Sequence, residues 1–235
     1  MARIDQRDFS LLQEFVDVYS LRKGAQSPGF VAFLKSMHRR HLMLMLVSAQ
    51  VGHLDVLEKD GLPGACLNDV VSDLTEAFFC VMNGAYKAAY TLLRSAIETY
   101  LRAVGRSEFP EILTITSVYQ LFDCAEDLPY FRTDAGSVCF KTLKASYGGL
   151  CKYVHSSMRS SHSSVSALSV FPTFEKSSAD RFKGYFEKVL VSMVDALVNA
   201  HPKIYLEMHF TGQDLLSDLL PRRTMRAVHG SSEVG

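Results

Sequence analysis

The sequence lacks the short motifs that mark the common nucleotide-binding and metal-dependent enzymes. It contains no P-loop, no GxGxxG, no GxSxG and no HExxH, and its five cysteines form no CxxC pair. An odd cysteine count without paired spacing favours reduced, mostly buried thiols over a disulfide framework or a zinc site. We therefore expect neither a cofactor nor a bound metal.

Long apolar runs and an excess of one charge are also absent. The longest apolar run, LMLMLV at 42–47, is far shorter than the roughly twenty residues that span a bilayer. The N-terminal stretch MARIDQRDFSLLQEF carries charges where a secretion signal needs apolar residues. The 25 basic residues balance the 25 acidic ones, which excludes a chain-wide basic field but leaves room for a local patch. These features predict a soluble, cytoplasmic protein without a membrane segment.

Apolar residues recur at helical spacing along nearly the whole chain. Stripes of this kind cover 30–49, 85–105, 138–154 and 180–206, and Asn68 is placed to cap a further helix that breaks near Asn83 and Gly84. Pro110 suits the first turn of a short helix, whereas 127–136 and the serine-rich 156–169 read as irregular. We find no β-hairpin pattern and no internal repeat, so we predict an all-α fold.

The same pattern suggests three parts. Residues 1–62 are expected to form N-terminal helices that pack on a core, and residues 63–210 the core bundle itself. Residues 211–235 read as a short helix followed by a basic polar tail. With 235 residues, 48% apolar and 21% charged, the chain is long enough to bury a sizeable core.

Arg94 and Glu98 stand one helical turn apart in the segment AYKAAYTLLRSAIETYLRAVG. Both border the apolar face that Leu93, Ile97 and Tyr100 form on a helical wheel. The spacing has two explanations of equal weight: a solvated ion pair, or an arginine that reaches into a groove between helices. The two interpretations stay open at this point.

A second polar cluster, YGGLCKYVHSSMRSSH, holds Tyr153, His155, Arg159 and His162. Histidine transfers protons near neutral pH, and arginine holds a phosphate, which are the requirements of metal-independent RNA cleavage. A histidine that caps a helix end beside a flexible loop is the competing interpretation, and for His162 alone it is the stronger one. Elsewhere in the chain, four consecutive cationic residues at 38–41, HRRH, are most simply interpreted as a helix face near solvent.

The segments NGAYKAAYTLLRSAIETYLRA and YGGLCKYVHSS together resemble the HEPN-like superfamily, especially its divergent bacterial branches in phage defence and abortive infection. The resemblance covers roughly 68–157. It implies a helical bundle, commonly a homodimer in which both protomers build one cleft, and a metal-independent RNA endonuclease. Active members carry an arginine, four to six residues and then a histidine. In this chain only two residues separate Arg159 from His162, and His155 precedes Arg159.

The departure from that signature leaves two possibilities. Either a catalytic site is assembled from Arg94, Glu98 and His155, with Tyr153, Arg159 and His162 contacting RNA, or catalysis has been lost. In the first case we expect a toxin-like RNA endonuclease of antiviral defence, in which His155 moves the proton, Arg94 clamps the phosphate and Glu98 orients them. In the second, the chain is a non-catalytic partner such as an antitoxin, adaptor or scaffold, or a nucleotide-sensing module.

Overall fold

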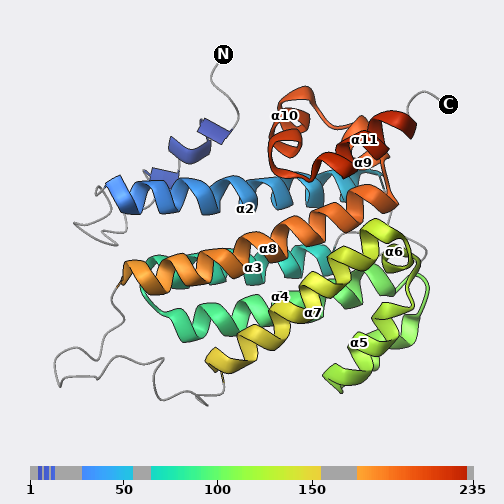
Figure 1. Cartoon of the computed structure of the whole chain (residues 1–235), viewed down its shortest axis with the longest axis horizontal. Coiled ribbons are helices and arrows are strands. Elements are labelled where there is room, and N and C mark those ends of the chain that lie inside the picture. The colour runs from blue at the N-terminus through green and yellow to red at the C-terminus, as the bar shows by residue number, and fades with distance from the viewer. Residues whose placement is uncertain are drawn as a thin grey trace.

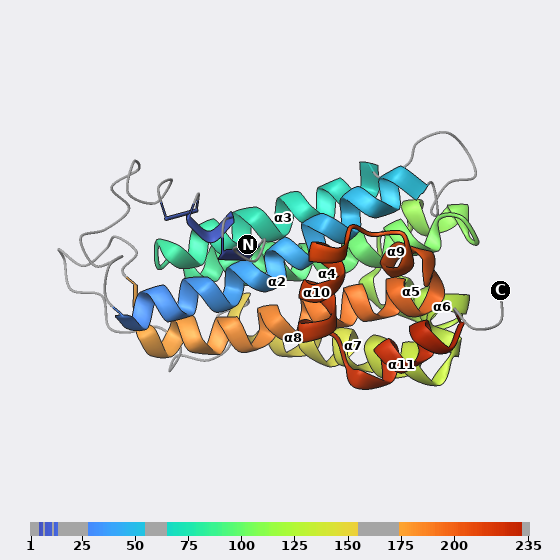
Figure 2. The same cartoon turned by 90° about the horizontal axis from the view of Figure 1, so that it is seen from above.

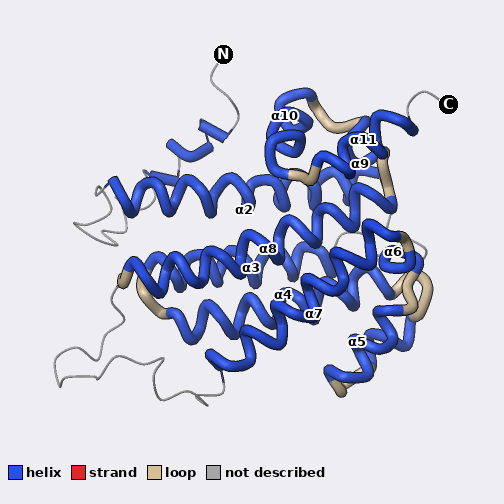
Figure 3. Tube along the Cα trace, in the orientation of Figure 1, coloured by secondary structure: helices blue, strands red, loops and turns tan. Residues whose placement is uncertain are grey.

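The computed structural model describes residues 5–6, 8–10, 12–13, 28–54, 65–154 and 174–231. Helices and the turns that join them make up these ranges, and no strand occurs in them (Figure 3). The prediction of an all-α fold is confirmed. The elements are α2 Pro28–Leu54, α3 Ala65–Met82, α4 Tyr86–Gly105, η1 Pro110–Thr114, α5 Val118–Glu126, α6 Pro129–Arg132, α7 Asp134–Val154, α8 Lys176–Ala200, α9 Lys203–Leu206, α10 Phe210–Leu219 and α11 Arg222–Ser231.

Five long helices form the body of the protein and close into a ring. Around it, α2 contacts α3, α3 contacts α4, α4 contacts α7, α7 contacts α8, and α8 returns to α2. In Figure 1, α2 lies along one side of α8 and α3, while α4 and α7 lie along the other. The short helices gather at one end of the long ones: α5 and α6 beside α4 and α7, and α9, α10 and α11 beside α2 and α8 (Figures 1 and 2).

The turn between α3 and α4 forms where the sequence predicts a break. Gly84 adopts φ 75°, a left-handed conformation that costs glycine little and residues with a Cβ more. Its N–H donates to the carbonyl of Val81 at 3.0 Å, and the N–H of Ala85 donates to that of Cys80 at 2.8 Å. These two bonds satisfy carbonyls that the helix end leaves open, in the Schellman arrangement. The chain therefore reverses within three residues and lays α4 along α3.

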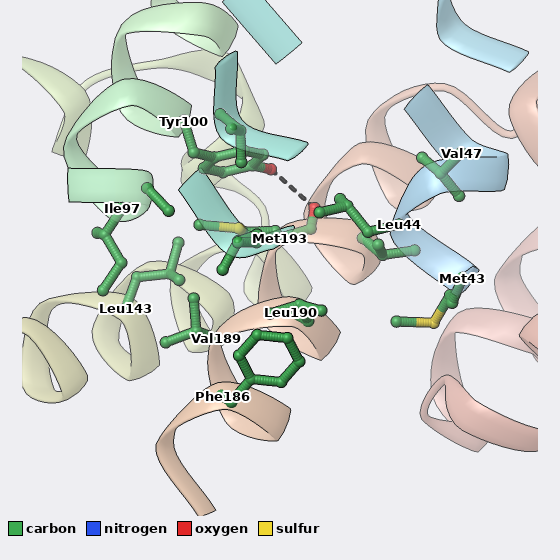
Figure 4. Close-up of a cluster of buried hydrophobic side chains, with 14 of the residues drawn as sticks. Met43, Leu44, Val47, Ile97, Tyr100, Leu143, Phe186, Val189, Leu190 and Met193 are labelled. Carbon is green, nitrogen blue, oxygen red and sulfur yellow. Dashed lines mark hydrogen bonds between the residues drawn. The ribbon is translucent and has the colours of Figure 1, made fainter. Parts of the chain in front are cut away.

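The core lies between α2, α4, α7 and α8 (Figure 4). Phe186, Leu190 and Met193 of α8 are fully buried, as are Ile97 and Tyr100 of α4. Tyr100 keeps its hydroxyl satisfied by donating to the carbonyl of Met193 at 2.8 Å. A buried phenol without an acceptor would be costly, so this bond explains how a tyrosine occupies a fully buried position.

A buried carboxylate joins α11 to α7 and α8. Asp195 of α8 is 1% exposed. It accepts hydrogen bonds from the thiol of Cys139 at 3.2 Å, from the amide of Asn199 at 2.7 Å, and from the hydroxyl of Thr224. Arg223 pairs with the same carboxylate at 3.0 Å. Burial and the neighbouring carboxylate raise the pKa of the Cys139 thiol, so that the thiol stays protonated and donates.

Several predicted boundaries are wrong. Asn68 does not cap α3, because the helix starts at Ala65; its side-chain oxygen accepts from Ser48 of α2 at 3.4 Å instead. Residues 127–136, expected to be irregular, form α6 and the first turn of α7. The helix expected over 180–206 starts at Lys176 and is interrupted at 201–202, where Pro202 has no N–H to continue the bonding. The expected polar tail forms α11 as far as Ser231.

Candidate functional site

Arg94 and Glu98 lie on the side of α4 that faces α7. Glu98 accepts a hydrogen bond from the hydroxyl of Tyr147 on α7 at 2.8 Å. Its carboxylate also stands 3.8 Å from Arg94 and 3.8 Å from Arg102, one turn away on either side. The Arg94 guanidinium sits over the Tyr147 ring, 5.7 Å from its centroid. These contacts join the two helices through a cluster that we call the Arg94 cluster: Arg94, Glu98, Arg102 and Tyr147.

The Arg94 cluster is partly open to solvent. The side chains of Arg94, Glu98 and Arg102 are 24%, 20% and 23% exposed. Burial, followed by the bond to Glu98, raises the pKa of Tyr147, so that its hydroxyl stays protonated near neutral pH. The two guanidinium groups outnumber the one carboxylate, which leaves a net positive charge at a position that water and an anion can reach.

Tyrosine rings stack along the same pair of helices, nearer the end of α7. Tyr153 stacks on Tyr90 of α4 with ring centroids 4.5 Å apart and planes 14° apart. Tyr185 of α8 meets Tyr153 edge-on at 6.1 Å, and the Arg181 guanidinium lies 5.9 Å from the Tyr153 centroid. Tyr90 is buried, whereas Tyr153 and Tyr185 are half-buried and Arg181 is exposed. We call these four residues the tyrosine platform.

One glycine permits the platform to form. A Cβ placed on Gly149 of α7 would lie 2.6 Å from the Tyr185 hydroxyl and 2.8 Å from a ring carbon. Such distances are too short for a van der Waals contact of a Cβ atom, so a side chain there would push the Tyr185 ring away from Tyr153. Gly149 lets α7 and α8 approach closely enough for their tyrosines to meet.

Helices α4 and α7, which carry the Arg94 cluster and part of the tyrosine platform, are basic. Helix α4 has Lys87, Arg94 and Arg102 against one acidic residue, and α7 has three lysines against one acidic residue, Asp134. Helix α3 is the reverse, with three acidic residues and no basic one. The zero net charge of the chain therefore hides a separation of charge between neighbouring helices.

A comparison of the chain with protein-family models, with curated proteins and with solved structures finds no match. The resemblance to HEPN-like proteins therefore stays a prediction. Among the described residues, no group of three His, Cys, Asp or Glu side chains is arranged to hold a metal ion. No helix in the described ranges has the length and apolar character needed to cross a membrane.

Three of the six predicted site residues can be placed. Arg94 and Glu98 meet as expected in the Arg94 cluster, and Tyr153 belongs to the tyrosine platform. The other three, His155, Arg159 and His162, lie outside the described residues. The expectation that the segment around Arg94 packs beside the one leading to His155 is confirmed as far as Val154, because α4 contacts α7.

Sequence reasoning missed most of the partners of these residues. Arg102 carries a visible signal, because it follows Glu98 by one helical turn just as Glu98 follows Arg94. Tyr90, Tyr185 and Arg181 carry none, since each reads as an ordinary stripe or surface residue of its own helix. Only the packing of α4, α7 and α8 brings them to Tyr153.

The interpretation of residues 38–41 as a solvent-facing cationic patch is wrong. His38 and His41 are 4% and 8% exposed and point into the protein. Arg39 pairs with Asp218 of α10 at 3.0 Å, and Arg40 is likewise paired, with a carboxylate of α8. Helix α2 packs against α3, α8 and α10, which explains why the side chains at 38–41 are buried or paired instead of forming a patch that faces solvent.

Proposed function

We propose that the chain binds RNA along the face formed by α4 and α7, and that it acts as a metal-independent RNA endonuclease of bacterial antiviral defence. The observation that carries the proposal is the pairing of the partly exposed Arg94 cluster with the neighbouring tyrosine platform, which the basic helices α4 and α7 share with α8. The resemblance to HEPN-like proteins supplies the defence context and the expected dimeric cleft.

Single-stranded nucleic acid is bound by cationic side chains that follow the phosphates and by aromatic rings on which bases stack. The α4–α7 face offers both kinds of group. Arg94 and Arg102 supply the cations, while Tyr153 and Tyr185 supply half-buried rings beside the exposed Arg181. Glu98 restrains Arg94 without neutralising the cluster, which fits the orienting role proposed for it.

Cleavage would use the 2′-hydroxyl of the RNA as nucleophile. The 2′-oxygen bonds to phosphorus while the 5′-oxygen of the next nucleotide leaves, one proton being removed from the first and one delivered to the second. In this proposal His155 moves the proton and Arg94 stabilises the charge on the phosphate. Arg159 and His162 are proposed to contact the RNA beside them.

The test uses the purified full-length protein and total RNA, with and without a chelator. Cleavage that survives chelation is expected. His155→Ala should lower its rate by about a hundred- to ten-thousand-fold, the usual loss for a positioned acid or base, with the melting temperature unchanged. Arg94→Ala should weaken both RNA binding and cleavage.

Lys87→Ala is the matched control for Arg94→Ala. Lys87 is an exposed basic residue two turns earlier on α4, and it belongs to neither cluster. If Lys87→Ala and Arg94→Ala weaken RNA binding equally, the protein attracts RNA only through general charge, and the site is wrong. Full activity in stable Arg94→Ala and His155→Ala proteins would remove both residues from the mechanism.

One observation favours a second candidate, a non-catalytic partner or scaffold. Every group of the Arg94 cluster is engaged with another, and its bonds link α4 to α7, as in an ion-pair network that serves stability. On this reading the wild-type protein does not cleave RNA, and Arg94→Ala lowers the melting temperature. A nucleotide-sensing module would instead bind a free nucleotide at the same cluster, and titration with nucleotides separates it from the other two.

A further inference from the structure

A pocket of about 480 Å³ opens between α2, α3 and the N-terminal residues Asp8 and Leu12, away from the α4–α7 face. Figures 1 and 2 show the short N-terminal helical segments, in dark blue, over α2 and α3 at this place. Its volume falls within the range of small-molecule sites. Most of its wall is apolar, with Phe78, Phe79, Met45 and Met82 among the lining residues. Phe79 and Met45 are each 41% exposed, so apolar surface continues to the open edge.

No lysine or arginine balances the carboxylates in this wall among the described residues. The carboxylates are those of Asp8 and Glu76. Glu76 is exposed and pairs with no basic residue among those the structure describes. His41, which also lines the pocket, adds no positive charge near neutral pH, because burial lowers its pKa to about 4.

His38 adds a buried atom that lacks a partner. Its Nε2 lies 2.6 Å from the carboxylate of Asp8, so this nitrogen carries the hydrogen and donates it. The other ring nitrogen, Nδ1, is buried and has no hydrogen-bond partner in the described part of the chain. In the neutral ring Nδ1 is an acceptor, and an N–H group of a ligand would satisfy it.

We propose that this pocket binds a small lipophilic amine, a compound with an aromatic or alkyl body and one ammonium group. The body would contact the phenylalanine rings and thioethers, and the ammonium group would pair with Glu76 or donate to His38. A cation also gains from lying over the face of an aromatic ring such as that of Phe79. A lipophilic carboxylate would meet Asp8 and Glu76, and a neutral apolar compound would leave Glu76 without a counter-charge. The site is independent of the proposed RNA face.

Three naphthalene compounds of matched shape test the charge preference. The protein contains no tryptophan, so naphthalene emission can be followed without tryptophan background. We expect 1-naphthylmethylamine to bind the full-length protein saturably at one site. The neutral 1-naphthylmethanol should bind more weakly, and 1-naphthylacetate weakest. Equal binding of the three compounds, or no saturable binding of the amine, would overturn the proposal.

Two carboxylates of α3 give a matched pair of variants. Glu76→Gln should weaken amine binding by up to about fivefold, as expected for a solvent-exposed ion pair, and leave binding of the alcohol unchanged. Asp69 lies two turns before Glu76 on α3 and does not line the pocket. Asp69→Asn removes the same charge there, and it should change the binding of neither the amine nor the alcohol. If both variants weaken the amine alike, only the general negative field of α3 attracts it. Phe79→Ser, at an exposed position, should weaken all three compounds, and unchanged binding would place the probe elsewhere.

Discussion

Asp195→Ala should lower the free energy of unfolding by about 3 kcal/mol, because it removes the shared acceptor of the buried network between α7, α8 and α11. Breaking a buried pair by removing one partner costs about 3–5 kcal/mol. The Arg223 side chain is 44% exposed, so water can solvate its charge once Asp195 is gone. The lower end of that range is therefore expected.

Most of the remaining cost comes from the neutral donors. The hydroxyl of Thr224, which is fully buried, and the thiol of Cys139 lose their acceptor, and each buried group left unsatisfied costs about 1–3 kcal/mol. For chains of about 150–250 residues, 1 kcal/mol corresponds to about 2–4 °C. Asp195→Ala should accordingly lower the melting temperature by about 6–12 °C.

Arg223→Ala is the comparison that isolates the buried part. It removes the charge partner but leaves Asp195 with its donors from Cys139, Asn199 and Thr224, so it should cost less than Asp195→Ala, about 1.5–2 kcal/mol for the lost bond to a charged group. Urea unfolding followed by circular dichroism measures both variants. If Arg223→Ala costs as much as Asp195→Ala, or if Asp195→Ala costs less than about 1 kcal/mol, the reasoning about the buried donors is refuted.

Three further outcomes are expected. Gly149→Ala should lower the free energy of unfolding by about 1–3 kcal/mol, because the added Cβ meets Tyr185. Gly148 is exposed with open space around it, so Gly148→Ala should raise the free energy of unfolding by about 0.5–1 kcal/mol. Urea unfolding of both variants tests this contrast. For His41 the folded-state pKa of about 4 lies below the ordinary 6.5, so the unfolded chain binds the extra proton and stability falls as the pH drops from about 6.5 to 4, by up to about 3 kcal/mol. Unfolding curves of His41→Gln across this range should be flatter, and an unchanged slope would contradict the assignment. We also expect at least a homodimer, because large apolar side chains such as that of Tyr119, which is 87% exposed, are not covered by the rest of the protein. Light scattering at micromolar concentration that gives only the mass of one chain, 26.2 kDa, would refute this expectation.

The aromatic residues Phe78 and Phe79 of α3 and Phe182 and Phe186 of α8 show the limit of reading one helix at a time. Phe182 and Phe186 are fully buried and Phe78 is 4% exposed, so these rings belong to the core; Phe79 alone of this group is exposed. A helical stripe indicates which residues share a face, but not whether that face meets another helix or solvent. The same limit explains the error at residues 38–41, where α2 is covered on more than one side.

Local chemistry predicted other features well. The glycine after Asn83 marks the turn between α3 and α4, and the spacing of Arg94 and Glu98 places both on one side of α4, where they meet. Tyr147 and Tyr185 could not be assigned to their partners, because those contacts join separate helices. Nothing in the spacing within α7 or α8 specifies how closely the two helices approach at Gly149.

The order of contacts around the ring has a consequence for folding kinetics. Helices α3 and α4 are joined by a turn of three residues and pack against each other, so their pairing closes a very short loop and costs little chain entropy. The contact between α2 and α8 joins segments that end at Leu54 and begin at Lys176, so about half of the chain lies between them. Because non-local contacts are entropically costly until nearer ones have formed, the α3–α4 hairpin is suited to form first and α2 with α8 to close the ring last.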